Sequence, residues 1–261
     1  MFNQRTSGYY QAIHQLIHSG QLGGLQRMQW TITNWFRTQA YYASSGWRAT
    51  WRGEGGGVLL NQSPHQLDLL CWMFGLPQQV RAFCHFGKYH PIEVEDEVTA
   101  YLEFPNGATG VFITSTGEAP GSNRLEIVGD LGRVVFEGDR LQFTRNTIGT
   151  AEFSKTSSNG FAAPPTEEVQ LVADGHGRQH AGILQNFTEA ILDGTPLLAP
   201  AEEGIQSVEL ANAMLLSSWL NRTIELPMNG QMFEYHLRRR MNESSSKDKR
   251  RSGRTKRAPR R

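Results

Sequence analysis

Three consecutive glycines followed by a long apolar run place the strongest constraint on how this chain folds. The run begins at Gly55 and continues from Val58 to Phe74, with Asn61, His65 and Asp68 among its polar residues. Glycine tolerates positive φ angles and allows another group to approach the backbone closely. The apolar residues that follow have helical spacing. Backbone access next to polar side chains on a helix predicts a functional site here.

The start of this helix is open to two interpretations. Ser63-Pro64-His65-Gln66 has the form of a capping box, with Ser63 as N-cap and Gln66 reaching back to it. His65 would then lie in the first turn, where the helix dipole disfavours an imidazolium. Alternatively, one longer helix kinks at Pro64 and places Asn61 and His65 on one face. A purely structural histidine also remains open, because no partner for it is evident in the sequence.

Short segments with strand-like alternation occupy the middle of the chain, and helical patterns lie toward its ends. The helices are expected at 9–19, 178–192 and 201–220, while residues 146–166 are expected to form a loop. Tight turns between the strands favour antiparallel pairing. The sequence therefore predicts an α+β fold, in which a large, open, mostly antiparallel sheet has helices packed on one face. The expected strands are 25–36, Gln79–Phe86, Asp96–Phe104, Ala108–Ser115, Arg124–Val128, Arg133–Glu137, Arg140–Thr144, Glu168–Val172 and Thr223–Pro227.

The charge of the chain is unevenly distributed. The formal net charge is +1, but residues 238–261 hold twelve Lys or Arg against Glu243 and Asp248, so this tail carries +10 and the remainder −9. With few apolar residues to bury, the tail is expected to be disordered. A basic run of this kind can contact nucleic acid or act as an import signal, but it is also typical of a simple solvated tail.

Features of secreted and membrane proteins are missing from the sequence pattern. The first residues lack the basic and apolar regions of a signal peptide, and no apolar run reaches the ~20 residues of a membrane span. Cys71 and Cys84 lie in apolar segments and are expected to be buried thiols. We therefore expect a cytoplasmic protein. The histidines show no metal-ligand spacing, so no metal site is expected.

An aromatic and cationic segment precedes the glycines, from Arg37 to Glu54. Its Trp and Arg residues could cover the core or form a wall that contacts a ligand. The glycines themselves do not form a dinucleotide-binding fingerprint, because that motif requires a buried strand before the glycine turn.

Several motifs in combination resemble the glucose-fructose oxidoreductase/inositol dehydrogenase family, often called Gfo/Idh/MocA. They are Gly46-Trp47-Arg48, the run from Gly55 to Asp68, and the segments 185–194, 200–204 and 221–227. The resemblance implies an N-terminal Rossmann domain and a C-terminal α/β domain with a large open sheet. It also implies oxidation or reduction of sugars, cyclitols or polyols with NAD or NADP.

The resemblance also implies a division of this chain. Residues 1–24 would be the last strand and helix of the Rossmann domain, 25–237 the substrate-binding and oligomerisation domain, and 238–261 the basic tail. The family's glycine fingerprint and catalytic Lys have no counterpart in the sequence, so the main cofactor-binding domain is expected to be missing. A homo-oligomer formed through the open sheet is expected.

If the roles of the family's residues are carried over by position, the resemblance implies that His65 is the general acid or base on a substrate hydroxyl. Asn61 would be its neighbour, at a position where many members have Asp. An amide can orient a hydroxyl but cannot stabilise an imidazolium by charge. Trp47 and Arg48 match a pair that approaches the cofactor. Trp51, Gln62 and His180 are expected to contact the substrate, and Asp68 to fix local structure.

The expected function is that of the substrate-binding portion of an NAD(P)-dependent oxidoreductase, which acts by hydride transfer on a sugar, cyclitol or polyol. The alternative is a non-catalytic sugar-binding or assembly protein without a cofactor domain. Nucleic-acid contact, through the basic tail, is a minor third possibility.

Overall fold

Nine strands form one sheet in the computed structural model, which describes residues 1–173 and 175–244. The strands are β1 (Leu25–Ile32), β2 (Gln79–Phe86), β3 (Glu95–Glu103), β4 (Thr109–Ser115), β5 (Asn123–Gly129), β6 (Gly132–Glu137), β7 (Arg140–Asn146), β8 (Thr166–Val169) and β9 (Ile224–Glu225). Their order is β8-β7-β6-β5-β1-β4-β3-β2-β9. The predicted α+β class with a large open sheet is confirmed.

One pair of strands at the centre of the sheet, β1 and β4, is parallel, whereas the other pairs are antiparallel. β1 runs parallel to β4, with Trp30 opposite Phe112, whereas its other neighbour β5 is antiparallel. Parallel strands require a crossover connection. Here the crossover is the whole segment from residue 33 to 108, which contains the glycine run and two further strands. The sheet is therefore mixed at its centre and antiparallel elsewhere.

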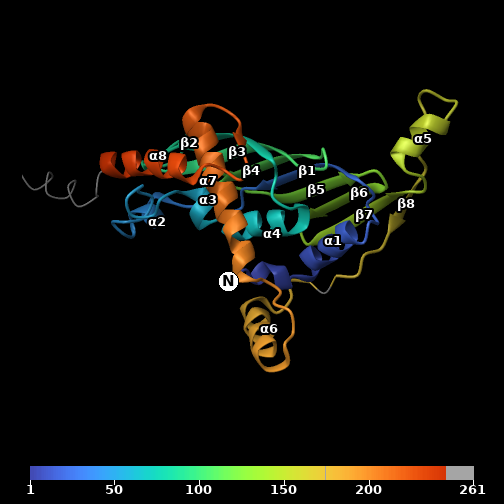
Figure 1. Cartoon of the computed structure of the whole chain (residues 1–261), viewed down its shortest axis with the longest axis horizontal. Coiled ribbons are helices and arrows are strands. Elements are labelled where there is room, and N and C mark those ends of the chain that lie inside the picture. Colours follow the sequence, from blue (N-terminus) through green and yellow to red (C-terminus); the bar gives the residue numbers. More distant parts are fainter. Residues whose placement is uncertain (174, 245–261) are drawn as a thin grey trace, which may run out of the picture.

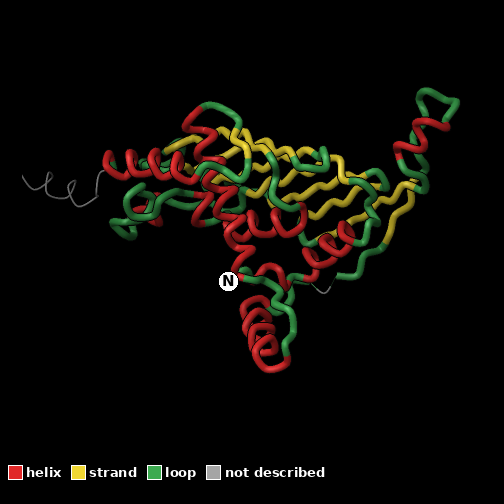
Figure 2. Tube along the Cα trace, in the orientation of Figure 1, coloured by secondary structure: helices red, strands yellow, loops and turns green. Residues whose placement is uncertain are grey.

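The helices gather mainly on one side of the sheet. Figure 1 shows α1, α4 and α7 across one face, while α6 stands away from the body, and Figure 2 shows the same layers by colour. Three helices lie where none was expected: α2 in the aromatic and cationic segment, α5 within the expected loop at 146–166, and α8 after the last strand. The α-helices are α1 (Gly8–His18), α2 (Gln39–Ala43), α3 (Val58–Asn61), α4 (Pro64–Phe74), α5 (Thr150–Thr156), α6 (Gln179–Asp193), α7 (Gly204–Leu220) and α8 (Gly230–Glu243), with 3-10 turns η1 (Asn3–Thr6) and η2 (Ala201–Glu203).

Strand β3 shows how one face is covered and the other is open. Val98, Ala100 and Leu102 are fully buried, whereas Tyr101, between two of them, is 43% exposed. Alternate residues of a strand point to opposite faces. On this face α3 packs against β3, and α7 packs against the neighbouring strand β2, with Leu210 and Met214 of α7 also fully buried. The opposite face is left accessible.

The glycine run allows a buried carboxylate to approach the backbone. Glu95 Oε1 accepts hydrogen bonds from the N–H of Gly57 at 2.8 Å and of Leu59 at 3.1 Å. A Cβ atom on Gly57 would overlap the carbonyl oxygen of Glu95. Glycine is therefore required here by close backbone packing.

The capping-box prediction is wrong. Ser63 makes no cap hydrogen bond, and its Oγ instead lies 3.0 Å from Thr114 Oγ1 on the sheet. Gln66 Nε2 donates to Gln4 Oε1 at 3.1 Å rather than reaching back to residue 63. The single kinked helix is also not formed, because α3 ends at Asn61 and α4 begins at Pro64. The side chains of Ser63 and Gln66 therefore form hydrogen bonds with residues distant in the sequence instead of the local capping bonds.

A buried salt bridge ties the amino-terminal segment to α4. Arg5 donates from Nε and Nη2 to the two carboxylate oxygens of Asp68 at 2.9 and 2.6 Å, and both side chains are 1% exposed. Its Nη1 also donates to Leu198 O and to Glu203. This bidentate geometry gives Asp68 the structural role expected of it.

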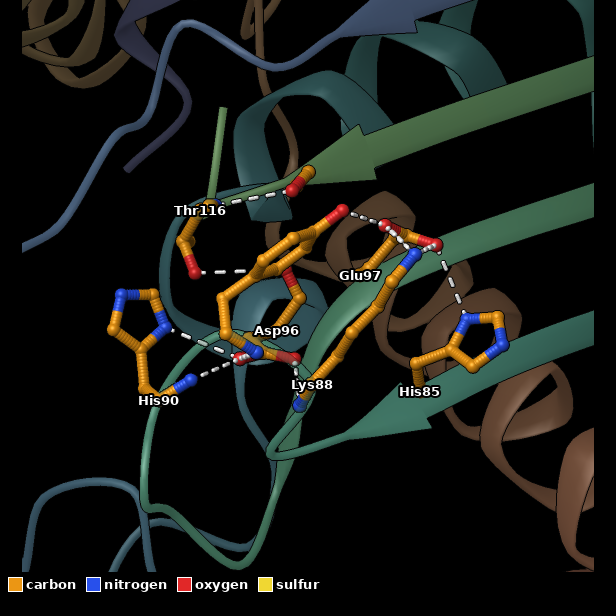
Figure 3. A network of polar contacts seen from close by, with 9 residues as sticks. His85, Lys88, His90, Asp96, Glu97 and Thr116 are labelled. Atoms are coloured by element: carbon orange, nitrogen blue, oxygen red, sulfur yellow. Dashed lines mark hydrogen bonds and ion pairs between the residues drawn. The ribbon is translucent and has the colours of Figure 1, made fainter. Parts of the chain in front are cut away.

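A second polar network fixes the loop between β2 and β3 (Figure 3). Asp96, fully buried, accepts from the backbone N–H of Lys88, Tyr89 and His90. His90 Nδ1 lies 3.1 Å from Asp96 Oδ2, and Nε2 lies 2.8 Å from the carbonyl oxygen of Arg37. The pair thus joins this loop to the segment that leads into α2.

The carboxyl-terminal part of the chain is more helical than expected. Residues 238–243, assigned to the tail from the sequence, continue α8 with i,i+4 ion pairs from Glu234 to Arg238 and from Arg239 to Glu243. The prediction for residues 245–261 lies outside the described residues. Cys71 and Cys84 are buried free thiols, as predicted. Within 1–173 and 175–244, no helix combines the length and hydrophobicity needed to cross a membrane.

Candidate active site

His65 lies in the first turn of α4, where its ring is partly buried. The ring meets Phe2 edge-on, with centroids 6.1 Å apart. Its Nδ1 is buried and has no hydrogen-bond partner in the described part of the chain. Burial lowers the pKa of His65 below its ordinary value, and nearby His180 adds to this effect. The imidazole is therefore neutral near pH 7, which suits a proton acceptor.

Tyr41 joins three of the predicted site residues. Its hydroxyl accepts from Arg48 Nη1 at 2.6 Å and from Gln62 Nε2 at 3.2 Å, and it donates to Asn61 Oδ1 at 3.1 Å. The Arg48 guanidinium also lies over two rings, 4.3 Å from the Tyr41 centroid and 4.7 Å from that of Trp47. Contacts with two ring faces restrict the orientation of the guanidinium plane.

Glu54, which lies between Gly53 and Gly55, contacts the same cluster. One carboxylate oxygen accepts from Asn61 Nδ2 at 2.5 Å and lies 3.9 Å from Arg48 Nη1. The other accepts from the backbone N–H of Ala49 at 2.6 Å. Asn61 is thus held by Glu54 and Tyr41, and no hydrogen bond joins it to His65 within the described residues. The expected one-face pairing of Asn61 with His65 is replaced by this network.

The remaining predicted residues lie apart from the cluster. Trp51 is only 7% exposed and packs edge-on against Trp219 at 5.5 Å, so its ring has no free face for a substrate. His180 lies near the start of α6 and is exposed. It approaches His65 closely enough to affect its titration but does not belong to the Tyr41 cluster.

Two residues of this region were not selected from the sequence. Tyr41 lies in the aromatic and cationic segment that could have been a cover or a ligand wall, and nothing in its spacing marks it as a centre. Glu54 is the acidic residue among the glycines, and only the fold shows that it faces Asn61 and Arg48. No group of side chains suited to a metal ion occurs in 1–173 or 175–244.

Comparison with known proteins finds a family model that matches part of this chain. Residues 10–135 match the family model described as the GFO/IDH/MocA C-terminal domain. No curated protein matches the chain. Among solved structures, the WlbA dehydrogenase of Chromobacterium violaceum, in complex with NADH and UDP-GlcNAcA, is 24% identical with a TM-score of 0.70. That alignment covers 88% of this chain and 62% of the other.

Two further structures show the same fold. The WlbA dehydrogenase of Bordetella pertussis is 24% identical with a TM-score of 0.68. The alignment covers 88% of this chain and 63% of that dehydrogenase. A levoglucosan dehydrogenase, in complex with NADH and levoglucosan, is 21% identical with a TM-score of 0.67. That alignment covers 87% of this chain and 65% of the levoglucosan dehydrogenase. The chain thus spans less than two thirds of the length of these proteins.

Proposed function

The chain belongs to the GFO/IDH/MocA family through the C-terminal domain at residues 10–135, and on this premise we propose that it supplies the substrate-binding half of an NAD(P)-dependent sugar or polyol oxidoreductase. The observation that carries the proposal is His65, a partly buried imidazole with a lowered pKa and a buried nitrogen without a partner. The domain division at residue 24 and the oligomerisation role of 25–237 belong to the same proposal.

In this proposal His65 takes the proton of a substrate hydroxyl during oxidation and returns it during reduction. A general base works best when it is neutral at the operating pH, and burial supplies that condition here. Its edge contact with Phe2 limits rotation of the ring. Asn61 and Gln62, fixed by Tyr41, then serve to orient the substrate rather than to move protons.

Trp47 and Arg48 are the proposed contacts to the cofactor. The Arg48 guanidinium lies over the rings of Tyr41 and Trp47, and half of the Trp47 surface is exposed beside it. A guanidinium matches the geometry of phosphate oxygens. When bound, the nicotinamide accepts or donates the hydride. The choice between NAD and NADP rests on groups that these residues do not supply.

Helix α6 supports the idea that a second domain completes the site. It contains no buried residue, and its Leu184, Phe187 and Ile191 are each more than half exposed. Figure 1 shows this helix standing away from the sheet and close to the amino-terminal segment. An apolar row of this kind is typical of a surface that packs against a partner. We assign that partner as a nucleotide-binding domain.

A second candidate function is a non-catalytic sugar-binding protein. It would rest on the Tyr41 cluster, which holds Asn61 and Gln62 and in which no hydrogen bond to His65 occurs within the described residues. The two candidates differ in one measurable respect, since only the first requires His65 for turnover.

The test compares His65→Ala and His65→Gln with the unaltered protein, each joined to the nucleotide-binding domain of the Chromobacterium WlbA dehydrogenase. Turnover of neutral sugars is followed by formation of the reduced cofactor. We expect a loss of roughly 10²- to 10⁴-fold in both variants. We also expect kcat/KM of the unaltered protein to rise with pH through an apparent pKa below 6.5. The control is His18→Ala on the exposed end of α1, which should retain full turnover.

Near-normal turnover in the His65 variants would assign this residue a structural role. Sugar binding without turnover in every version, including the unaltered one, would support the non-catalytic alternative.

A further inference from the structure

Helix α8 lies beside α7, at the end of the sheet where α2 and α3 also lie (Figure 1). It adds little to the core, because Phe233 alone is buried among Gly230–Glu243. Its carboxyl-terminal end instead meets the turn that leads into the glycine run, residues 47–54. We call this segment the 47–54 turn. It carries Trp47 and Arg48, the two proposed contacts to the cofactor.

Arg52 caps the end of α8 from this turn. Its Nε and Nη2 both donate to the carbonyl oxygen of Met241, at 3.3 and 3.1 Å. The last four carbonyl groups of a helix have no partner within the helix, and the helix dipole favours a cation beside them. The backbone N–H of Arg52 also donates to the Oγ of Ser244, the residue that follows α8, at 3.5 Å.

Glu93, in the loop between β2 and β3, joins the same two segments. Its Oε2 accepts from the Oγ of Ser244 at 2.6 Å and from the backbone N–H of Trp51 at 3.3 Å. Hydrogen bonds to a carboxylate are stronger than those between neutral groups. One carboxylate oxygen therefore links the end of α8 to the 47–54 turn. We call the contacts of Arg52, Glu93 and Ser244 the α8 clamp.

A row of aromatic rings connects the turn to α8 at a second place. Trp51 meets Trp219 of α7 edge-on, with centroids 5.5 Å apart, and Trp219 in turn stacks on Phe233 of α8 at 5.5 Å. Arg240 of α8 lies 3.9 Å from the Trp219 centroid. Aromatic pairs and cation–π contacts of this kind stabilise packing beyond the area they bury. The position of Trp51 thus depends on α8 as well as on α7.

The 47–54 turn is closed on itself, so that its two ends cannot move independently. The Oγ1 of Thr50 donates to the carbonyl oxygen of Trp47 at 2.8 Å and accepts from the backbone N–H of Gly53 at 3.0 Å. A Cβ atom on Gly53 would overlap that same carbonyl oxygen, which shows how closely the two strands of the turn approach. A contact that fixes Arg52 therefore also fixes the backbone at Trp47 and Arg48.

We infer that α8 is a positioning element, which holds the 47–54 turn and thereby keeps Trp47 and Arg48 in place for a nicotinamide dinucleotide. The inference rests on the proposed function, because it takes these two residues as the cofactor contacts. Arg52 is a positioning residue in this scheme, since it acts through the turn. Glu54 carries the effect onward: it accepts from the backbone N–H of Ala49 at 2.6 Å and lies 3.9 Å from Arg48 Nη1.

The first test needs no cofactor and uses the 261-residue chain. Hydrogen exchange of the Ala49 N–H is followed by NMR and divided by that of the Val98 N–H, which lies in the centre of the sheet and reports unfolding of the whole fold. We expect this ratio to rise about tenfold in Arg52→Ala and in Ser244→Ala, as the turn loses one or two hydrogen bonds. Arg52→Lys retains a cation at the end of α8 and should restore most of the slow exchange.

The second test measures the cofactor in the fusion with the nucleotide-binding domain of the Chromobacterium WlbA dehydrogenase. We expect Arg52→Ala and Ser244→Ala each to raise the KM for NAD⁺ about tenfold with little change in kcat, because a contact that binds ground state and transition state equally is weakened. Ser244→Ala alters no charge, so it separates positioning from a direct contact of Arg52 with phosphate. The control is Arg238→Ala on the exposed side of α8, which should change neither the exchange ratio nor KM.

Two results would overturn the inference. An unchanged exchange ratio in both Arg52→Ala and Ser244→Ala would show that α8 does not hold the turn. A KM that rises in Arg52→Ala but not in Ser244→Ala would show that Arg52 binds the cofactor directly.

Arg48→Ala in the same fusion distinguishes failure of the inference from failure of the proposed function. If Arg48→Ala raises the KM for NAD⁺ while the clamp variants do not, the cofactor contact stands and the role of α8 is wrong. If Arg48→Ala leaves KM unchanged, the proposed contact itself is refuted, and the role assigned to α8 falls with it.

Discussion

Glu95 accepts a hydrogen bond from the backbone N–H of Gly57 at 2.8 Å, while its own carbonyl oxygen occupies the space where a side chain on residue 57 would begin. One glycine therefore lets a strand of the sheet contact the start of α3 through both its side chain and its main chain. Because α3 leads into α4, this contact also sets the position of His65.

The first prediction concerns Gly57→Ala. The new methyl group would overlap the Glu95 carbonyl, so either the strand or the loop must shift. We expect a loss of about 3 kcal/mol in the free energy of unfolding, at the upper end of overpacking effects. Urea denaturation measures it. Gly24→Ala is the matched control, because a Cβ there meets no atom within 4 Å. Equal stability of the two variants would show that the loop adapts freely.

The second prediction concerns the ionisation of Glu95. Burial raises the pKa of Glu95 to about 7, because its effect exceeds that of the backbone hydrogen bonds, which lower this pKa. Since the folded protein then holds a proton that the unfolded chain releases above its ordinary pKa, stability falls as pH rises from about 4.5 to 7. The shift corresponds to roughly 3 kcal/mol.

Glu95→Gln removes this dependence while retaining an acceptor for Gly57 and Leu59. We expect the variant to be more stable than the unaltered protein at pH 8 and equally stable near pH 4. Thermal unfolding across this range gives the comparison. Parallel curves for the two proteins between pH 4.5 and 7 would contradict the assignment to Glu95.

The third prediction concerns the buried pair of Arg5 and Asp68. Asp68→Ala would leave the guanidinium buried, with Glu203 and the carbonyl of Leu198 as its remaining hydrogen-bond acceptors among the described residues. We expect a loss of 3–5 kcal/mol, the usual cost of breaking a buried pair. The exposed pair of Arg238 and Glu234 provides the control, since Arg238→Ala should cost less than about 1 kcal/mol. A small effect of Asp68→Ala would mean that solvent reaches Arg5.

The fourth prediction concerns oligomerisation through the open face of the sheet. Phe83 and Tyr101 lie on neighbouring strands and are 54% and 43% exposed. Placing Glu at both positions introduces charge into the proposed interface. We expect the double variant to be monomeric by light scattering, with an unchanged midpoint of thermal unfolding. A monomeric unaltered protein would refute the oligomer itself.

The extent of most strands followed directly from the sequence. Alternation and turn residues located β2 at its observed bounds and placed β3 to β7 within one or two residues. Such local signals reflect one covered face and tight connections. The parallel pairing of β1 with β4 carries no local signal, because it depends on how a 76-residue crossover returns to the sheet.

The site was only partly predictable for a similar reason. His65 and the run around it could be selected by motif, but the hydrogen bonds of Ser63 and Gln66 go to Thr114 and Gln4, which are distant in sequence. The hydrogen bonds of Tyr41 depend on three side chains, one from the segment before the glycine run and two from the end of α3. Helix α8 was missed because five of its fourteen residues are charged and only Phe233 among them all is buried, which leaves a weak apolar pattern.

The central position of β1 has a consequence for the order of folding. β1 ends at Ile32, but its neighbours in the sheet begin at Thr109 and Asn123. During synthesis the strand therefore leaves the ribosome long before either partner exists. The hairpins β2–β3–β4 and β5–β6–β7 can each form from local contacts. The late, long-range insertion of β1 between them is the step that should limit the folding rate.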